Sequence, residues 1–293
     1  MTIEQFNEMA ARGVILLDGA TGSNLRAAGM PVGVSTEAWV YDHPEVILEL
    51  QRAYVDAGSD IIYAPTFMAN RIGLQMHGIE NRLRELNTGL VKLSKQAADG
   101  HARVAGDITT TGKPLEPIGT LTYQMLYDLY REQVEALAEA GADLLVAETM
   151  MTIEECACAI EAARSVCDLP VMCSLTMEAD GHLLFGGSAV EAVETLQAAG
   201  ATAVGLNCSV GPDQLEAVVR GMKAVAEVPV IAKPNAGLPV MDDKGQAHYS
   251  MGPEAFAEAM LRLIDAGASV IGGCCGTTPA HIRALRDRLN RAG

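Results

Sequence analysis

Short apolar segments alternate with amphipathic segments along the whole chain. The short segments are apolar throughout rather than at every second position, which is typical of strands buried on both faces of a parallel sheet. Several of them follow an Ala-Gly or Asp-Gly pair, where glycine supplies the left-handed residue that ends a helix. This pattern predicts eight strands, at 14–18, 60–64, 103–107, 143–148, 170–176, 202–206, 229–233 and 268–272.

The segments between these strands predict helices, because their apolar residues recur at helical spacing. The helices are expected near 44–57, 80–98, 122–140, 152–167, 188–199, 212–226, 253–266 and 279–290. Eight β–α units in 293 residues have the order and size of a closed (β/α)8 barrel, or TIM barrel. We therefore predict an α/β protein with a single barrel domain over residues 1–293. The alternative, an open doubly wound sheet, would need G-x-G-x-x-G after the first strand, and DGATGSN at 18–24 lacks that spacing.

The composition is that of an ordinary folded protein and limits the possible partners. Hydrophobic residues make up 49% of the chain, and the net charge of −16 disfavours binding to nucleic acid or to anionic membranes. The first residues, MTIEQFNEMAARG, lack the apolar core of a signal peptide, and no apolar run reaches the ~18 residues of a membrane span. Seven cysteines without an export signal indicate a cytoplasmic location, where thiols stay reduced or bind metal.

Polar and sulfur-containing side chains follow nearly all of the predicted strands. They stand at the carboxyl ends of the strands, the end of a barrel at which active sites lie. These residues are Asp18, Thr66, Asp107, Glu148, Ser174, Thr176, Asn207, Cys208, Lys233, Asn235, Cys274 and Cys275. Such a convergence on one face of the barrel indicates a functional site there.

Three of the cysteines are candidate metal ligands. Cys274 and Cys275 lie between glycines at the end of the eighth strand, and Cys208 ends the sixth. Strands of the same parity contribute to common layers of a barrel, so the three sulfurs can meet. Three thiolates around Zn²⁺ leave a fourth position open, as in catalytic zinc sites. The alternative for the adjacent pair is a vicinal disulfide or two buried thiols. The remaining cysteines are expected to be core or surface thiols, with Cys156, Cys158 and Cys167 in a helix and Cys173 in a strand.

Two carboxylates at strand ends are candidate substrate ligands. Burying Asp18 or Glu148 is costly without a cation or a hydrogen-bond donor, and together they suit the ammonium group of an amino acid. The alternative is that each one binds backbone amides of the following loop. Small residues could offer backbone N–H groups to a substrate carboxylate, namely Ala20, Thr21 and Gly22. Two asparagines are either substrate ligands or turn formers, namely Asn207 and Asn235.

Seven stretches give the chain a resemblance to a known family. They are LLDGATGSNL at 16–25, APTFMANRIGL at 64–74, AGDITTTGKPLEPIGTLT at 105–122, LLVAETM at 144–150, VGLNCSVGP at 204–212, KPNAGLP at 233–239 and IGGCCGTTPAHI at 271–282. The sequence resembles the homocysteine S-methyltransferase family, and within it the homocysteine-binding barrel of cobalamin-dependent methionine synthase. One departure is ITTTG at 108–112, where a proline is expected at Thr110, so this loop is expected to be less constrained.

The resemblance implies a site and a reaction. It implies a TIM barrel with Zn²⁺ on Cys208, Cys274 and Cys275, and with homocysteine held by Asp18 and Glu148. Zinc would keep the substrate sulfur as a thiolate, the nucleophilic form, which attacks an activated methyl group and gives methionine.

The expected methyl donor is methylcobalamin on a separate corrinoid protein. The corrinoid-binding pattern D-x-H-x-x-G fails twice in this chain, because Val104 and Phe185 stand at the glycine position after Asp99 and Asp180. The alternatives are a small donor, namely S-methylmethionine, S-adenosylmethionine or betaine, and a different thiol acceptor. A non-catalytic zinc-binding or corrinoid-protein-docking component is the alternative outside the enzymes.

Overall fold

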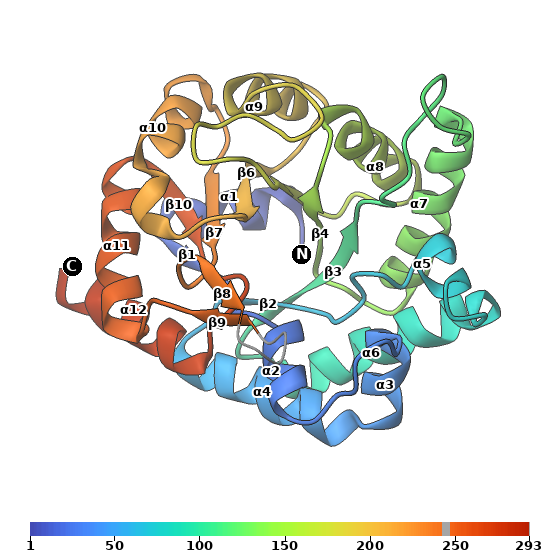
Figure 1. Cartoon of the computed structure of the whole chain (residues 1–293), viewed down its shortest axis with the longest axis horizontal. Coiled ribbons are helices and arrows are strands. Elements are labelled where there is room, and N and C mark those ends of the chain that lie inside the picture. Colours follow the sequence, from blue (N-terminus) through green and yellow to red (C-terminus); the bar gives the residue numbers. More distant parts are fainter. Residues whose placement is uncertain (242–246, 293) are drawn as a thin grey trace.

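The computed structural model describes residues 1–241 and 247–292, so the expected single domain over 1–293 includes a few residues outside the described ones. Eight parallel strands form one sheet in the order β1-β10-β7-β6-β5-β4-β3-β2. The two edge strands meet because Leu17, which follows β1, pairs in parallel with Ile61 of β2. Helices surround this ring of strands (Figure 1). The predicted (β/α)8 barrel is therefore confirmed.

Each predicted strand overlaps an observed one. The barrel strands are β1 Ile15–Leu16, β2 Ile61–Tyr63, β3 Arg103–Thr109, β4 Leu144–Met150, β5 Val171–Leu175, β6 Ala203–Cys208, β7 Val230–Pro234 and β10 Ala268–Ile271. A short antiparallel pair, β8 Pro239–Met241 and β9 Ala247–Tyr249, follows β7 and was not predicted.

The eight predicted helices are also present. The helices are α1 Ile3–Ala11, α2 Gly22–Ala27, α3 Thr36–Asp42, α4 Pro44–Ala57, α5 Arg71–Gln75, α6 Leu83–Ala98, α7 Tyr123–Glu139, α8 Ile153–Val166, α9 Ala189–Ala198, α10 Glu216–Val225, α11 Pro253–Asp265 and α12 Pro279–Ala292. The predicted starts at 80 and 212 correspond to the 3-10 turns η1 Glu80–Arg82 and η2 Pro212–Gln214. Within the described residues, no helix combines the length and the apolar character that a membrane span requires.

Strand residues alternate between the inside of the barrel and the surrounding helices. In β4, Leu144 and Val146 belong to the cluster inside the barrel, whereas Leu145 and Ala147 pack in the outer cluster toward the helices. Both faces are fully buried, which explains why the strands read as continuous apolar runs. Continuing the inward positions by one step reaches Glu148, at the carboxyl end of the strand. The alternation therefore turns the last inward side chains toward the opening of the barrel.

Helix α1 fills the opposite end of the barrel. Phe6 is fully buried within the inner cluster, and Met9 and Ala10 pack against that cluster. The N-terminal ammonium group of Met1 donates a hydrogen bond of 2.8 Å to the carbonyl oxygen of Asp143, just before β4. The chain end lies near the barrel axis in Figure 1. This helix is not among the predicted ones, because the segment MTIEQFNEMAARG is considered in the sequence analysis only for the features of a signal peptide.

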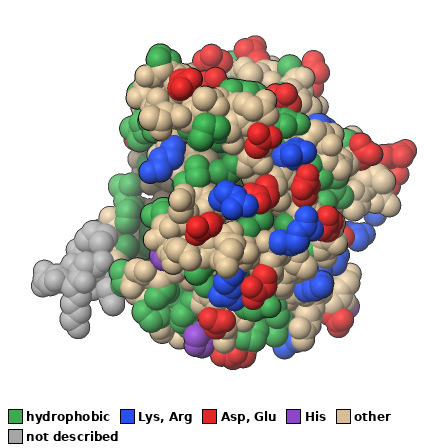
Figure 2. Space-filling view, turned by 90° about the vertical axis from the view of Figure 1, so that its right-hand side faces the viewer, with side chains coloured by type: hydrophobic (Ala, Val, Ile, Leu, Met, Phe, Trp, Pro, Cys, Tyr) green, Lys and Arg blue, Asp and Glu red, His purple; other side chains and the backbone are tan. Residues whose placement is uncertain are grey.

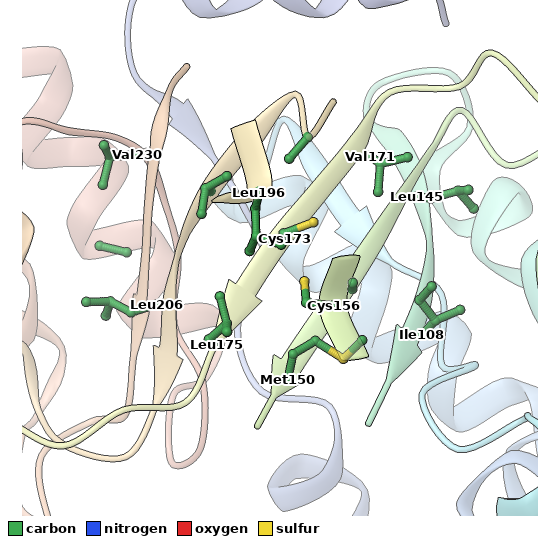
Figure 3. Packing of buried hydrophobic residues seen from close by; sticks show 14 of the residues in the cluster. Ile108, Leu145, Met150, Cys156, Val171, Cys173, Leu175, Leu196, Leu206 and Val230 are labelled. Atoms are coloured by element: carbon green, nitrogen blue, oxygen red, sulfur yellow. The ribbon is translucent and has the colours of Figure 1, made fainter. Parts of the chain in front are cut away.

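The outer layer between strands and helices contains the cysteines that lie far from the predicted metal site. Figure 3 shows Cys173 of β5 and Cys156 of α8 among apolar side chains that include Leu175. Both cysteines are fully buried, as is Cys158 in the same helix, while Cys167 caps the end of α8 and is half-buried. The prediction that these four are core or surface thiols is confirmed.

The surface around α5, α6 and α7 carries charges of both signs. Figure 2 shows acidic and basic side chains interspersed on this side of the molecule. Arg71 pairs with Glu132, and Arg84 pairs with Glu139, so these helices are joined by exposed ion pairs. Each such pair stabilises the fold by about 0–1 kcal/mol at most. This side therefore contributes little that points to a charged partner.

Candidate functional site

The structure brings together the three cysteines that the sequence singles out. Cys208 ends β6, and Cys274 and Cys275 follow β10. The Sγ atom of Cys208 lies 2.9 Å from that of Cys274 and 3.8 Å from that of Cys275, and all three sulfurs lie within 4.8 Å of one another. They are free thiols rather than a vicinal disulfide. Among the described residues, no other group of three or more His, Cys, Asp or Glu side chains comes this close together.

The glycines around Cys274 and Cys275 allow this loop to fold tightly. A Cβ atom on Gly273 would lie 2.4 Å from the side chain of Thr277. Gly276 has a φ of +80°, and a Cβ atom there would lie 2.2 Å from the ring of Tyr249. Only glycine can lie this close to the neighbouring side chains, and only glycine adopts the positive φ of Gly276 without strain. The loop is then fixed by backbone hydrogen bonds, which run from Cys274 N to the Pro234 carbonyl and from Ala236 N to the Cys275 carbonyl.

Cys208 lies in a strained stretch of backbone. Its φ is +61°, that of Ser209 is also +61°, and that of Thr149, at the end of β4, is +57°. Non-glycine residues seldom adopt this region, and such strain persists where the surrounding contacts enforce it. Asn207 supplies contacts of this kind, because its side chain makes two hydrogen bonds to Thr149, at 2.7 and 3.0 Å. The backbone conformation that presents the Cys208 thiol is therefore tied to the end of β4.

The chemistry of the three thiols fits a divalent metal ion. Hydrogen bonds from Cys208 and Cys274 lower the pKa of Cys275 to about 3, whereas hydrogen bonds with Cys274 and Cys275 raise the pKa of Cys208. These opposite shifts favour ionisation of Cys275 over that of Cys208, and a bound cation would favour ionisation of all three thiols. Zn²⁺ bonded to sulfur at ~2.3 Å in a tetrahedron separates the sulfurs by about 3.8 Å, the distance between Cys208 and Cys275.

A second group of charged residues lies beneath the cysteines. Asp18, Asp107, Glu148 and Lys233 are all buried at the carboxyl ends of their strands. The Lys233 Nζ atom lies 3.1 Å from Glu148 Oε1 and 3.7 Å from Asp18 Oδ1, and 4.8 Å from the centre of the Tyr63 ring. Asp18 also accepts a 2.8 Å hydrogen bond from the Tyr63 backbone N–H. Two carboxyl groups therefore contact one ammonium group, and a third, that of Asp107, is buried near enough to interact with it electrostatically.

Burial shifts the protonation of this acidic group. It raises the pKa of Asp18 to about 7, although Lys233 opposes the shift. It also raises the pKa of Asp107 well above its usual value, and Glu148 adds to that shift. Burial alone would lower the pKa of Lys233, but Glu148 and Asp18 outweigh it and raise that pKa well above 10.5. The floor of the site therefore contains an ion pair of Lys233 with Glu148 beside two carboxyl groups, Asp18 and Asp107, whose charged forms burial disfavours.

The cysteines and the acidic group line one cavity of about 450 Å³. Its lining also includes Ala20, Thr21 and Gly22. The Ala20 N–H already donates to Thr277 Oγ1, at 3.0 Å. Helix α2 begins at Gly22, so its first backbone N–H groups have no partner within the helix. The predicted amide and carboxylate ligands thus face the same space.

The two predicted asparagines do not line this cavity. Asn207 binds Thr149, and its Nδ2 atom lies 3.9 Å from Cys274 Sγ. Asn235 donates to the Ser209 carbonyl at 3.2 Å, while its Oδ1 atom is buried without a hydrogen-bond partner among the described residues. Both lie next to the cysteine cluster rather than beside the acidic group.

Asp107 and Lys233 are the site residues that sequence reasoning did not select. Both belong to the polar residues at the ends of the predicted strands, but neither of them is assigned to substrate binding in the sequence analysis. The signal that could have found them is the two-residue alternation, because Ala105 and Ile231 lie inside the barrel and the next inward positions are Asp107 and Lys233.

The loop that begins at Thr110 is held more firmly than expected. The Thr110 hydroxyl donates to Glu155 Oε2 at 2.5 Å and accepts from the Gly112 N–H at 3.1 Å. Thr111 donates to Glu155 Oε1 through both its N–H and its hydroxyl. The expectation of a less constrained loop was wrong at its first residues, because the buried Glu155 carboxylate fixes a segment that lacks the proline.

A sequence model described as homocysteine S-methyltransferase matches residues 15–289. The chain belongs to the homocysteine S-methyltransferase family. Among curated proteins, this family member is 32% identical to the methionine synthases of Mycobacterium leprae (strain TN) and Mycobacterium tuberculosis (strain ATCC 25618 / H37Rv). The alignments cover 97% and 95% of this chain but 25% of each relative, so the chain spans about a quarter of their length.

Solved structures place the same family on this fold. The homocysteine methyltransferase MmuM from Escherichia coli is 26% identical and aligns over 94% of this chain and 96% of its own. Its metallated and oxidized forms superpose with TM-scores of 0.79 and 0.80. The expected membership of the homocysteine S-methyltransferase family is therefore confirmed.

Proposed function

We propose that this chain is a zinc-dependent homocysteine S-methyltransferase that forms methionine with methylcobalamin on a separate corrinoid protein as donor. The observation that carries the proposal is the meeting of three cysteine sulfurs, from the ends of β6 and β10, in a cavity with an acidic floor. The metallated form of MmuM, a protein of similar fold, supports a metal at such a site.

The three thiolates of Cys208, Cys274 and Cys275 would hold the metal. Zn²⁺ bound there would supply a Lewis acid with one open position, which lowers the pKa of a substrate thiol and favours the nucleophilic thiolate. The protein contributes the position of the three sulfurs, which the glycine loop and the strained end of β6 fix in advance. Within the described part of the chain, the group of converging ligand atoms consists of the three cysteine sulfurs alone, and binding of the substrate sulfur to the metal would release the thiol proton without requiring a dedicated base.

The cavity offers separate places for the two charged groups of homocysteine. Asp18 and Glu148 would attract the ammonium group, and the backbone N–H groups of Thr21 and Gly22 would bind the carboxylate. Asn207 and Asn235 do not line the cavity and would act on the substrate indirectly, Asn207 through its two hydrogen bonds to Thr149 and Asn235 through its hydrogen bond to the Ser209 carbonyl. Held in this way, the substrate sulfur approaches the cysteine cluster.

The proposed reaction transfers a methyl group from the cobalt of the donor to the sulfur of homocysteine. The substrate thiolate attacks the methyl carbon, a carbon–sulfur bond forms, and the bond from that carbon to the donor breaks. The donor would keep the bonding electron pair, so a methylcobalamin donor would be left as cob(I)alamin. The sulfur of the product is an uncharged thioether, which would bind a metal ion less tightly than the thiolate does.

The choice of donor is supported by the sequence comparison. The chain is 32% identical to the two methionine synthases and 26% identical to MmuM. The experiment supplies homocysteine with methylcobalamin, S-methylmethionine, S-adenosylmethionine or betaine, and measures methionine. We expect the highest rate with methylcobalamin. A higher rate with a small donor would reassign the donor, and a zinc-loaded protein that forms no methionine with any of them would support a non-catalytic role.

A further inference from the structure

Lys233 lies where the amino group of the acceptor was expected to bind. Its Nζ atom is 3.1 Å from Glu148 Oε1 and 3.7 Å from Asp18 Oδ1, so it contacts both carboxylates that would attract a substrate ammonium group. Its side chain is only 4% exposed, and the Tyr63 ring lies on another side of it. A protein ammonium group therefore occupies part of the space between these carboxylates.

The floor of the cavity is balanced in charge by the protein itself. Lys233 offsets the charge of Glu148, its nearest carboxylate. Asp107 and Asp18 are buried at 4% and 1% exposure, and each has an oxygen without a hydrogen-bond partner among the described residues. Lys233 already faces Asp18 and Glu148 as a cation, and burial raises the pKa of Asp18 and Asp107, which reduces the negative charge left for a substrate cation to offset.

This charge balance affects how strongly the site should reject an acceptor that has no amino group. A site that depends on a substrate amino group rejects the analogue lacking it by a factor of about 10⁴ to 10⁵, because buried polar groups are left unpaired. Here Lys233 stays in place when the substrate brings no ammonium group. The remaining requirements are a thiol at the cysteines and an anionic group near the amides at the start of α2.

We propose that Lys233 is a specificity-determining residue that stands in for the amino group of the acceptor, so that the site also methylates mercaptocarboxylates that have no amino group. The proposal rests on the proposed function, since it uses the same cysteines and the same donor. The bonds made and broken would be those of the homocysteine reaction. A carbon–sulfur bond would form and the carbon–cobalt bond would break, with the electron pair left on cobalt and the thiol proton released to solvent. The product is a methylthio carboxylate.

The test compares homocysteine with 4-mercaptobutyrate, the same skeleton without the amino group. With methylcobalamin as donor, we expect kcat/KM for homocysteine to exceed that for 4-mercaptobutyrate by less than about 100-fold. A larger preference would overturn the proposal while leaving the proposed function intact. We expect Lys233→Met to raise the preference for homocysteine at least tenfold, because it removes the internal ammonium group. Equal losses for both acceptors would show a merely structural lysine and would also overturn the proposal.

A control variant and a binding measurement separate the role of Lys233 from the proposed function. Lys92→Met makes the same substitution on the exposed side of α6, and we expect it to leave the acceptor preference unchanged. Calorimetry on the metal-free protein with methionine and with 4-(methylthio)butyrate tests the same preference without turnover. If neither acceptor is methylated, the proposed function fails. Dissociation constants within about 100-fold would then still support the role of Lys233, and a wider gap would contradict it.

Discussion

Asn207 binds Thr149 through both ends of its side-chain amide. Its Oδ1 atom accepts the Thr149 N–H at 3.0 Å, and its Nδ2 atom donates to the Thr149 hydroxyl at 2.7 Å. Asn207 directly precedes Cys208, and Thr149 directly follows Glu148. This pair of hydrogen bonds therefore links the strand that carries a cysteine of the cluster to the strand that carries a carboxylate of the cavity floor.

The link predicts a specific effect of Asn207→Ala. Thr149 has a φ of +57°, which costs about 1–3 kcal/mol unless contacts enforce it. We expect the variant to lose about 1–3 kcal/mol in free energy of unfolding and about tenfold or more in kcat/KM for the acceptor. Thr149→Gly tests the strain, because glycine adopts this φ freely, and Thr149→Ala is its control, because it removes the same hydroxyl but keeps a Cβ atom on the strained backbone. The loss on Asn207→Ala should shrink in the Thr149→Gly background, and an equal loss in both backgrounds would show that the strain is not what Asn207 offsets.

The cysteine cluster predicts which thiols hold zinc. We expect Cys208→Ala and Cys274→Ala to bind much less zinc than the unmodified protein, because each removes one of three converging sulfurs. Cys167→Ala is the control, since this half-buried cysteine caps α8 far from the cluster. Metal content after dialysis, measured by atomic emission, gives the result. Zinc loss from the Cys167 variant, or full retention by the Cys208 variant, would contradict the assignment.

The glycine loop predicts the effect of adding one methyl group. In Gly276→Ala the new Cβ atom would lie 2.2 Å from the Tyr249 ring on a backbone with a φ of +80°. We expect a loss of about 1–3 kcal/mol in free energy of unfolding, together with weaker zinc binding as the loop moves. The matched substitution Gly221→Ala lies in α10, where the nearest atom is 3.9 Å away. It should stabilise the protein by about 0.5–1 kcal/mol, as expected for alanine within a helix.

The buried carboxyl group of Asp18 predicts a pH dependence of stability. Burial raises its pKa from 3.8 to about 7 in the folded state. Its contribution is therefore fully present below pH 3.8 and is lost as the pH rises through 7, because the unfolded chain releases the proton earlier. We expect urea unfolding of the metal-free protein to show a decline of the order of a few kcal/mol across this range.

Two variants identify the group responsible. Asp18→Asn should flatten the decline, since it has no proton to release. Asp287→Asn, an exposed change on α12, should leave the decline as it is. A profile that stays the same in Asp18→Asn would assign the decline to another group.

Much of the fold was predictable because its signals are repeated and local. Strands such as β4 are uninterrupted apolar runs, and helices such as α4 end at a left-handed glycine, Gly58. Of the helices that were not predicted, α2, α3 and α5 have only five to seven residues, too few for a helical period to be recognised. Their position is decided by contacts across the mouth of the barrel, which the order of residues does not show.

The site was predictable in its sulfur atoms and less so in its charges. The cysteines have a distinctive pattern, since Cys274 and Cys275 are adjacent and Cys208 ends another strand. Lys233 was harder to recognise, because its importance comes from its distance to Asp18 and Glu148, which belong to other strands. The loop at Thr110 shows the same limit, since its partner Glu155 lies 45 residues further along the chain.

Helix α1 has a consequence for the order of events during turnover. Because Phe6 packs within the inner cluster at the far end of the barrel, the acceptor, donor and product of the proposed reaction would all use the opening beside the cysteines. If the donor is a corrinoid protein that covers that opening, the acceptor would arrive first and the methylated product would leave after the donor has withdrawn. Under the proposed function, the nine-residue helix α1 would thus favour a sequential kinetic scheme for chemistry at the other end of the barrel.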